Sequence, residues 1–171
     1  MLHLVVYQPE IPQNTGNMMR TCVATGTVLH LIEPLGFKVD DKSLKRAGMD
    51  YIDRLTWYVH KDWNEFMEKN NNPKNIYFLT RYGEVPPSHF DYSNIEEDYY
   101  FVVGKESTGI DKDILKDHLD HCMRLPMTKE SRSLNVSNTA AIIIYEALRQ
   151  QNYASLEFEE YLKGPNVLNG E

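Results

Sequence analysis

The sequence of 171 residues has few cysteines and no long apolar segment. Its two cysteines, Cys22 and Cys122, are too few for a disulfide framework, so we expect two free thiols and a reducing, cytoplasmic location. No apolar run approaches the roughly 20 residues that a membrane-spanning helix needs, so we expect no membrane partner. The first seven residues, MLHLVVY, lack a basic flank and a small-residue cleavage site, and they indicate a strand rather than a signal peptide.

The chain also lacks an excess of basic residues. It carries 18 Lys and Arg against 25 Asp and Glu, and this formal net charge of −7, taken alone, argues against nucleic acid as a partner. The first 60 residues are neutral, however, and the acid is clustered at residues 96–98 and near the C-terminus at Glu157, Glu159 and Glu160. A local basic face therefore remains compatible with the composition.

Several catalytic signatures are absent as well. There is no G-x-G-x-x-G dinucleotide fingerprint, no Walker loop and no G-x-S-x-G nucleophile elbow. His118, His121 and Cys122 stand close together, but no second ligand pair lies at the spacing of a zinc site, so we expect no metal.

Short apolar runs alternate with amphipathic stretches along the chain, and this alternation predicts an α/β fold with a mostly parallel sheet flanked by helices. The predicted strands are Leu2–Tyr7, Val28–Glu33, Asn75–Thr80, Tyr99–Gly104 and Cys122–Leu125. The predicted helices are Thr15–Thr25, Lys42–Ala47, Asp62–Asn70, Asp111–Leu119 and Ser137–Gln151. We expect one domain over residues 1–154 and an acidic C-terminal tail over residues 155–171, as a helix or a frayed end.

Three loops at predicted strand ends carry the residues that suit chemistry. In residues 12–22, Asn14 or Thr15 can cap a helix whose N-terminus suits an anion such as an RNA phosphate. Residues 101–110 run from a hydrophobic strand into a loop bounded by Gly104 and Gly109. Residues 125–138 form a polar loop before the last helix, which Ser137 or Asn138 can cap. Each loop read alone is also compatible with an ordinary connection.

Taken together and in this order, the three segments resemble the three signature motifs of the SPOUT superfamily. Within it they are most similar to the small tRNA wobble-position ribose 2′-O-methyltransferases (the TrmL/CspR-like group). The first motif matches PQNTGN at residues 12–17 with Arg20, and the second matches FVVGKE at residues 101–106 with Gly109. The third matches LPM at residues 125–127, SLNVS at residues 133–137 and Tyr145-Glu146. The resemblance covers residues 1 to about 153.

The resemblance implies a SPOUT fold with a C-terminal trefoil knot, a homodimer and S-adenosyl-L-methionine as the cofactor. It implies that the enzyme methylates the ribose 2′-hydroxyl of the wobble nucleotide, cytidine or modified uridine, in tRNA, with leucine-type tRNAs as substrates. The cofactor-binding residues that it implies are Leu79, Thr80, Gly104, Glu106, Gly109, Leu125, Met127, Ser133, Leu134 and Asn135.

The resemblance also makes Arg20 catalytic, with Asn135 and Tyr145 as helpers that orient the reactants. Because a guanidinium is a very weak acid, we favour Arg20 as a group that holds the RNA phosphate or stabilises a developing alkoxide over a role as the base. With no additional RNA-binding domain expected, the tRNA would bind basic residues of the dimer itself, for which the candidates are Arg20, Lys42, Lys45, Arg46, Arg81, Lys129 and Arg132.

Three alternatives remain from the sequence. A ribosomal RNA target is the main rival to tRNA within the same activity. A non-catalytic RNA-binding or dimeric scaffold protein that kept the fold is the second, although Arg20 and Asn135 argue against it. A nucleotide-dependent enzyme of the Rossmann type is the third, and the absence of its glycine fingerprint argues against it.

Overall fold

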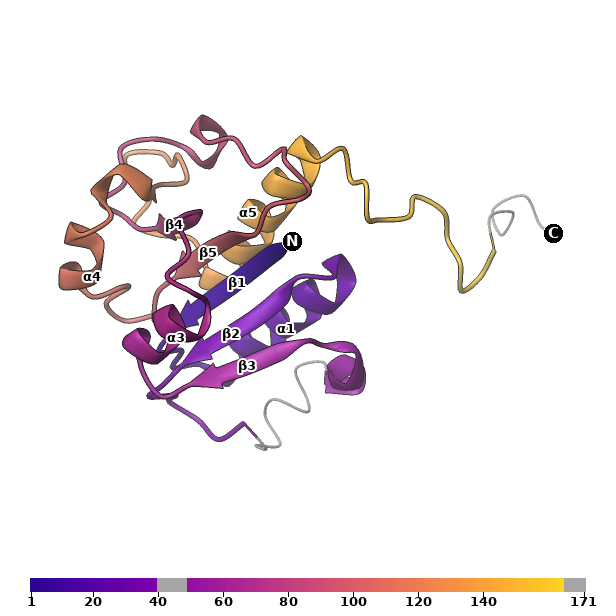
Figure 1. Cartoon of the computed structure of the whole chain (residues 1–171), viewed down its shortest axis with the longest axis horizontal. Helices are drawn as coiled ribbons and strands as arrows, with labels where there is room; N and C mark the ends of the chain where they lie inside the picture. The colour runs from indigo at the N-terminus through magenta and orange to yellow at the C-terminus, as the bar shows by residue number, and fades with distance from the viewer. Residues whose placement is uncertain (40–48, 165–171) are drawn as a thin grey trace.

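The computed structural model describes residues 1–39 and 49–164, and a six-stranded sheet lies at its centre (Figure 1). The order across the sheet is β3-β2-β1-β5-β4-β6, and every pair of neighbours is parallel. The predicted α/β class with a mostly parallel sheet is confirmed. The strands are β1 (Leu2–Tyr7), β2 (Val28–Ile32), β3 (Trp57–His60), β4 (Ile76–Leu79), β5 (Tyr99–Val103) and β6 (Cys122–Met123).

The helices follow the strands, as predicted, with changes at their ends. They are α1 (Pro12–Thr25), α3 (Trp63–Lys69), α4 (Lys112–Lys116) and α5 (Val136–Gln150), with short 3-10 helices at Met49–Arg54, Pro87–His89 and Leu119–His121. The helix predicted over Asp111–Leu119 was too long, because it ends at Lys116 and the chain turns before a separate 3-10 segment. The helix predicted over Lys42–Ala47 lies outside the described residues.

Side chains alternate across β1 and so build two cores, one on each face of the sheet. Leu4 and Val6 belong to the core that α1 and α5 cover, together with Met18, Ile143 and Ile144. Val5 and Tyr7 belong to the opposite core, with Phe66 of α3 and Leu115 of α4. The predicted apolar stripe of the last helix is confirmed, since Ala140, Ile143, Ile144, Ala147 and Leu148 are all buried.

A file of three buried histidines crosses the sheet from β1 to β3. His3 Nδ1 lies 3.0 Å from His30 Nε2, and His30 Nδ1 lies 3.0 Å from His60 Nε2. The rings stack on one another, and Tyr100 stacks on His3 with 4.1 Å between ring centroids. Burial, and then the neighbouring His3 and His60, lower the pKa of His30 to about 3, so this side chain is neutral in the fold.

β1 and β5 are neighbours at the centre of the sheet, and the chain that follows each of them continues toward a different side of the sheet. β2 and β3 extend the sheet on the β1 side, while β4 and β6 extend it on the β5 side. In open parallel sheets, ligands bind outside the carboxyl ends of the strands at such a switch point. The loops that begin at Gln8 and at Gly104 therefore stand where a ligand site is expected.

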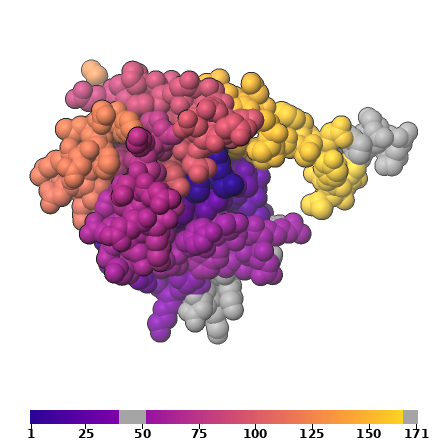
Figure 2. All heavy atoms as spheres, viewed as in Figure 1, coloured from indigo at the N-terminus to yellow at the C-terminus, as the bar shows by residue number. Residues whose placement is uncertain are grey.

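After α5, Tyr153 and Leu156 still pack against the core, and the chain then leaves the body. Figures 1 and 2 show this segment projecting away from the sheet, and residues 155–164 hold no helix or strand. Cys22 and Cys122 are buried free thiols that belong to different cores. Among the residues described, no helix is both long and apolar enough to cross a membrane.

Candidate functional site

A pocket of about 810 Å³ lies at the carboxyl ends of β1, β4, β5 and β6. Its wall contains every residue that the resemblance implied for cofactor binding, drawn from four separate parts of the chain: Leu79, Thr80, Gly104, Glu106, Gly109, Leu125, Met127, Ser133, Leu134 and Asn135. Arg81, Lys105 and Arg132 add positive charge to the same wall. The volume lies within the range typical of small-molecule sites.

The loop after β5 is folded tightly upon itself. A Cβ at Gly104 would lie 2.4 Å from the carbonyl carbon of Gly109, so the backbone leaves no room for any other residue there. Gly109 has a φ of +76°, a left-handed conformation that favours glycine, and its N–H donates to the carbonyl of Lys105 at 2.9 Å. The two glycines shape the loop that lines the pocket.

The carboxylate of Glu106 joins this loop to the segment after β1. It accepts hydrogen bonds from the N–H of Glu10 at 2.9 Å, from the N–H of Ile11 at 3.1 Å and from Nδ2 of Asn14 at 3.1 Å. Glu10 makes the reverse connection, because its carboxylate accepts from the hydroxyl of Ser107 at 2.7 Å and from the Ser107 N–H at 2.9 Å. These bonds from Ser107 lower the pKa of the Glu10 carboxyl.

Asn14 and Asn135 extend the connection to the third motif. Asn135 Nδ2 donates to Asn14 Oδ1 at 2.9 Å, while Asn135 Oδ1 accepts from the N–H groups of Ser137 at 2.9 Å and Asn138 at 3.3 Å. A continuous chain of hydrogen bonds thus runs from Glu106 through Asn14 to the start of α5. All three motifs meet at one edge of the pocket.

Two predicted helix caps are wrong. Asn135, rather than Ser137 or Asn138, caps α5, because its side-chain oxygen faces the free N–H groups of the first turn. α1 begins earlier than predicted, at Pro12 with Ile11 as the N-cap, so Asn14 and Thr15 lie inside its first turn. That position frees the Asn14 side chain to bond Glu106 and Asn135.

A polar cluster supports Lys105 at the rim of the pocket. Its Nζ donates to Gln8 Oε1 at 2.9 Å and lies 3.8 Å from Asp111 Oδ1. Tyr7 donates to Asp111 Oδ2 at 2.6 Å, and burial followed by this hydrogen bond raises the pKa of Tyr7. Sequence reasoning missed Gln8, Glu10, Ser107 and Asp111, and only their positions beside the motif loops pointed to them.

The other catalytic candidates stand away from this pocket within one chain. Arg20 is exposed on α1, about 9 Å along the helix axis from Asn14. Tyr145 is 46% exposed on α5, about 15 Å along the axis from Asn135. Neither lines the pocket, whereas Asn135 does. One chain therefore does not bring the three catalytic candidates together.

Only some of the candidate RNA-binding residues lie at the pocket. Arg81 and Arg132 line the pocket, and Lys129 is exposed in the loop that follows Met127. Lys42, Lys45 and Arg46 lie outside the described residues. Within residues 1–39 and 49–164, no group of three His, Cys, Asp or Glu side chains is arranged to hold a metal ion.

Comparison with known proteins identifies relatives over most of the chain. A family model described as the SpoU rRNA Methylase family matches residues 1–145. A protein of Bacillus subtilis (strain 168), named as a candidate tRNA (cytidine(34)-2′-O)-methyltransferase, is 54% identical over 156 residues, which are 91% of this chain and 97% of that protein.

Solved structures share the fold. One described as giving insight into the 2-OH methylation of C/U34 on tRNA has a TM-score of 0.80 at 37% identity, and the match covers 90% of this chain and 97% of that one. The SpoU methyltransferase AviRb from Streptomyces viridochromogenes, in complex with the cofactor AdoMet, has a TM-score of 0.73 at 22% identity, with coverage of 89% and 58%. The second likeness concerns the fold alone.

Proposed function

Because this chain belongs to the SpoU rRNA methylase family, we propose that it transfers a methyl group from S-adenosyl-L-methionine to the ribose 2′-hydroxyl of the wobble nucleotide of tRNA. The observation that carries the proposal is the convergence of three motifs on one pocket, where Glu106, Asn14 and Asn135 form a continuous chain of hydrogen bonds. The relatives named or described for position 34 of tRNA support the choice of substrate.

The residues of the pocket fit the cofactor. Leu79, Leu125 and Leu134 offer apolar surface to an adenine ring, and the folded loop from Gly104 to Gly109 brings backbone groups close to a ligand. When bound, S-adenosyl-L-methionine supplies an electrophilic methyl group on its sulfonium. The chain's own contribution is to orient the ribose hydroxyl toward that methyl group and to keep the loops fixed.

A homodimer is part of the proposal, because Arg20 and Tyr145 need a second subunit to meet a pocket. α1 and α5 lie side by side on one face of the sheet, and α5 leaves Ile142 and Tyr145 45% and 46% exposed there. In the proposed dimer this face packs against the second copy, and Arg20 and Tyr145 of one copy serve the pocket of the other. Arg20 then binds the RNA phosphate or stabilises the developing alkoxide.

The finer features of the fold belong to the proposal as well. We assign residues 1–154 to one methyltransferase domain with a C-terminal trefoil knot, and residues 155–171 to an acidic tail. The segments after β4 and β6 pack closely, since a Cβ at Gly83 would lie 2.3 Å from the Met123 carbonyl carbon. The Thr80 N–H also donates to the Met123 carbonyl at 3.0 Å.

The test uses the purified protein with labelled S-adenosyl-L-methionine and total RNA, tRNA and ribosomal RNA together, from a strain that lacks this gene. We expect transfer to the 2′-hydroxyl of cytidine or modified uridine at the wobble position, in leucine-type tRNAs of the cytoplasm. Mapping of ribose methylation identifies the nucleotide. Transfer to a base atom, to ribosomal RNA in preference to tRNA, or no transfer at all contradicts the proposal.

A further inference from the structure

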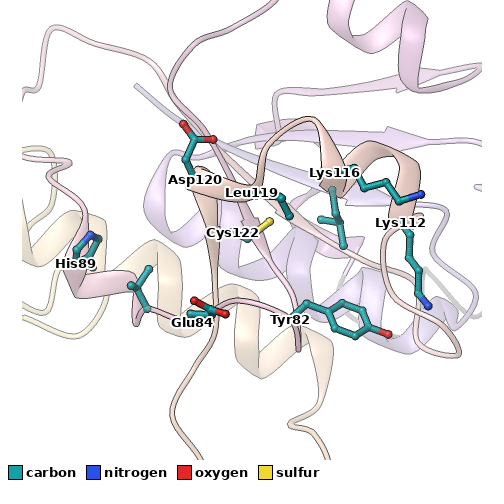
Figure 3. A pocket seen from close by; sticks show the side chains of 10 residues that line it. Tyr82, Glu84, His89, Lys112, Lys116, Leu119, Asp120 and Cys122 are labelled. Carbon is teal, nitrogen blue, oxygen red and sulfur yellow. The ribbon is translucent and has the colours of Figure 1, made fainter.

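A second pocket, of about 610 Å³, adjoins the first and is not used by the mechanism above. It lies between α4 and the segment of residues 82–89, with β6 at its base (Figure 3). Tyr82 and Lys112 line both pockets, so the two are neighbours with a common wall. A ligand that extends out of the first pocket meets this one next.

The side nearest the common wall is aromatic and basic. Tyr82 is 57% exposed, and Lys112 Nζ lies 5.7 Å from the centroid of its ring. Lys116 follows Lys112 by one helical turn, so both ammonium groups belong to one face of α4. Lys116 pairs with Asp113 at 2.9 Å, but both side chains are exposed and such pairs contribute little, so Lys116 can exchange this partner for another anion.

The opposite side is acidic and the base of the pocket is apolar. Figure 3 shows Glu84 and Asp120 on the side away from Lys112 and Lys116. Leu115 and Cys122 are buried and line the pocket between the two sides. One ligand class matches this order of groups: a nucleotide, with its phosphate at the lysines, its base on the tyrosine ring and an exocyclic amino group toward a carboxylate.

We propose that this pocket binds a nucleotide of the substrate RNA that flanks the methylated one and carries an amino-bearing base. The inference rests on the proposed function, because the RNA must already be held at the first pocket. Tyr82 stacks on the base, Lys112 and Lys116 contact its phosphate, and Glu84 accepts a hydrogen bond from the amino group. Lys112 and Lys116 would thus give this acidic chain a local basic surface for RNA.

The test measures methyl transfer to an anticodon stem-loop RNA, together with cofactor affinity by calorimetry. We expect Tyr82→Ala to raise KM for the RNA about tenfold, while Kd for S-adenosyl-L-methionine changes less than twofold, because base stacking on one aromatic side chain is lost. Tyr82→Phe should restore most of the affinity, since it keeps the ring. The control is Tyr161→Ala, which removes an exposed tyrosine from the C-terminal segment.

A variant that removes the charge of Lys112 tests the proposed phosphate contact. Lys112→Gln should reduce the salt dependence of RNA binding by about 0.7 in the slope of log K against log salt, as for one phosphate contact to a single strand. Lys74→Gln, an exposed lysine before β4 that lines neither pocket, is the matched control and should leave the slope unchanged. Ultraviolet cross-linking of the RNA should label the peptide that contains Tyr82.

The outcomes separate the inference from the proposed function. If wild-type protein methylates no ribose, the proposed function has failed. If wild-type protein is active but the Tyr82 and Lys112 variants keep their KM and salt slope, the second pocket does not bind RNA. If Tyr82→Ala instead weakens cofactor binding tenfold with an unchanged KM for RNA, the pocket belongs to the cofactor and the inference is wrong.

Discussion

Asn135 donates a hydrogen bond from Nδ2 to Asn14 Oδ1 at 2.9 Å, across 121 positions of sequence. Each asparagine also makes a second contact, because Asn14 donates to Glu106 and Asn135 caps α5. The start of α1, the loop after β5 and the start of α5 are therefore held by amide groups that use both their donor and their acceptor. A substitution that keeps only one of these functions separates the role of Asn135 in the helix from its role in the pocket.

Asn135→Ser tests this separation. Serine is a good helix cap, so we expect the free energy of unfolding to stay within about 0.5 kcal/mol of wild type, whereas Asn135→Ala should lose about 1 kcal/mol. Serine is too short to reach Asn14, so both variants should lose affinity for the cofactor. Urea unfolding and calorimetry measure the two effects. Wild-type affinity in Asn135→Ser would show that the Asn14 contact does not shape the pocket.

Gly104 and Gly109 offer a matched pair in one loop. Gly104→Ala places a Cβ 2.4 Å from the Gly109 backbone, so the loop must move, and we expect a loss of about 3 kcal/mol in stability and a loss of cofactor affinity. A Cβ at Gly109 would meet nothing within 4 Å. Gly109→Ala should therefore lose only about 1 kcal/mol of stability, the cost of placing alanine at the left-handed φ of +76°. Thermal unfolding measures the stability of the two variants, and calorimetry measures their affinity for the cofactor. Equal effects from both variants would contradict the close contact at Gly104.

The histidine file predicts a loss of stability in acid. His30 stays neutral in the fold, with a pKa of about 3, whereas an unfolded histidine takes up a proton below about pH 6.5. The unfolded chain therefore binds more protons, and the free energy of unfolding should fall between about pH 6.5 and pH 3, by about 1.4 kcal/mol per pH unit for His30 alone. Above pH 6.5 this contribution is constant.

The measurement is urea unfolding at several pH values and one protein concentration. His30→Phe removes the titrating group among rings that already surround it, so its stability should vary less steeply with pH, although its stability at pH 7 should be lower because His3 and His60 lose a partner. His89→Gln, an exposed histidine, is the control. Parallel pH curves for wild type and His30→Phe would refute the role given to burial.

The sequence was sufficient for elements whose pattern is set by burial. β1 is buried at every position and was predicted with its observed bounds, and α5 has an apolar stripe that one residue of shift at each end does not obscure. β3 was missed although its sequence, WYVH, is a short aromatic and β-branched run that favours a strand. In the fold it is an edge strand in which Tyr58 and Val59 are more than a third exposed. It forms a strand because it pairs with β2, and that pairing depends on the tertiary structure.

Part of the site was also predictable from the sequence. Ordered motifs identified the residues that now line one pocket, but periodicity alone gave only three loops. Pro12 was a usable signal for the start of α1, because proline favours the first helical turn. The Glu10–Ser107 contact had no such signal, since it joins exposed polar residues 97 positions apart whose pairing depends on the neighbouring ends of β1 and β5.

Arg20→Ala gives the sharpest test of a dimeric active site. Arg20 lies outside the pocket of its own chain, so the variant should bind the cofactor like wild type, while loss of a cation at the developing alkoxide or the RNA phosphate should reduce kcat by about 10²–10³-fold. Arg20→Lys keeps the charge but not the planar fork, and we expect partial activity. Arg54→Ala removes an exposed arginine just before β3, at the edge of the sheet away from the pocket, and should remain fully active.

A mixture of two inactive variants shows which pocket Arg20 serves. If Arg20 acts on the pocket of the second subunit, dimers that combine one Arg20→Ala chain with one Asn135→Ala chain contain one pocket with both residues intact and one with neither. Mixing and re-equilibrating the two inactive proteins should then restore about a quarter of wild-type turnover per chain, because half of the dimers are mixed and each has one complete site. If Arg20 serves its own chain, every pocket in the mixture lacks one residue, and no activity returns.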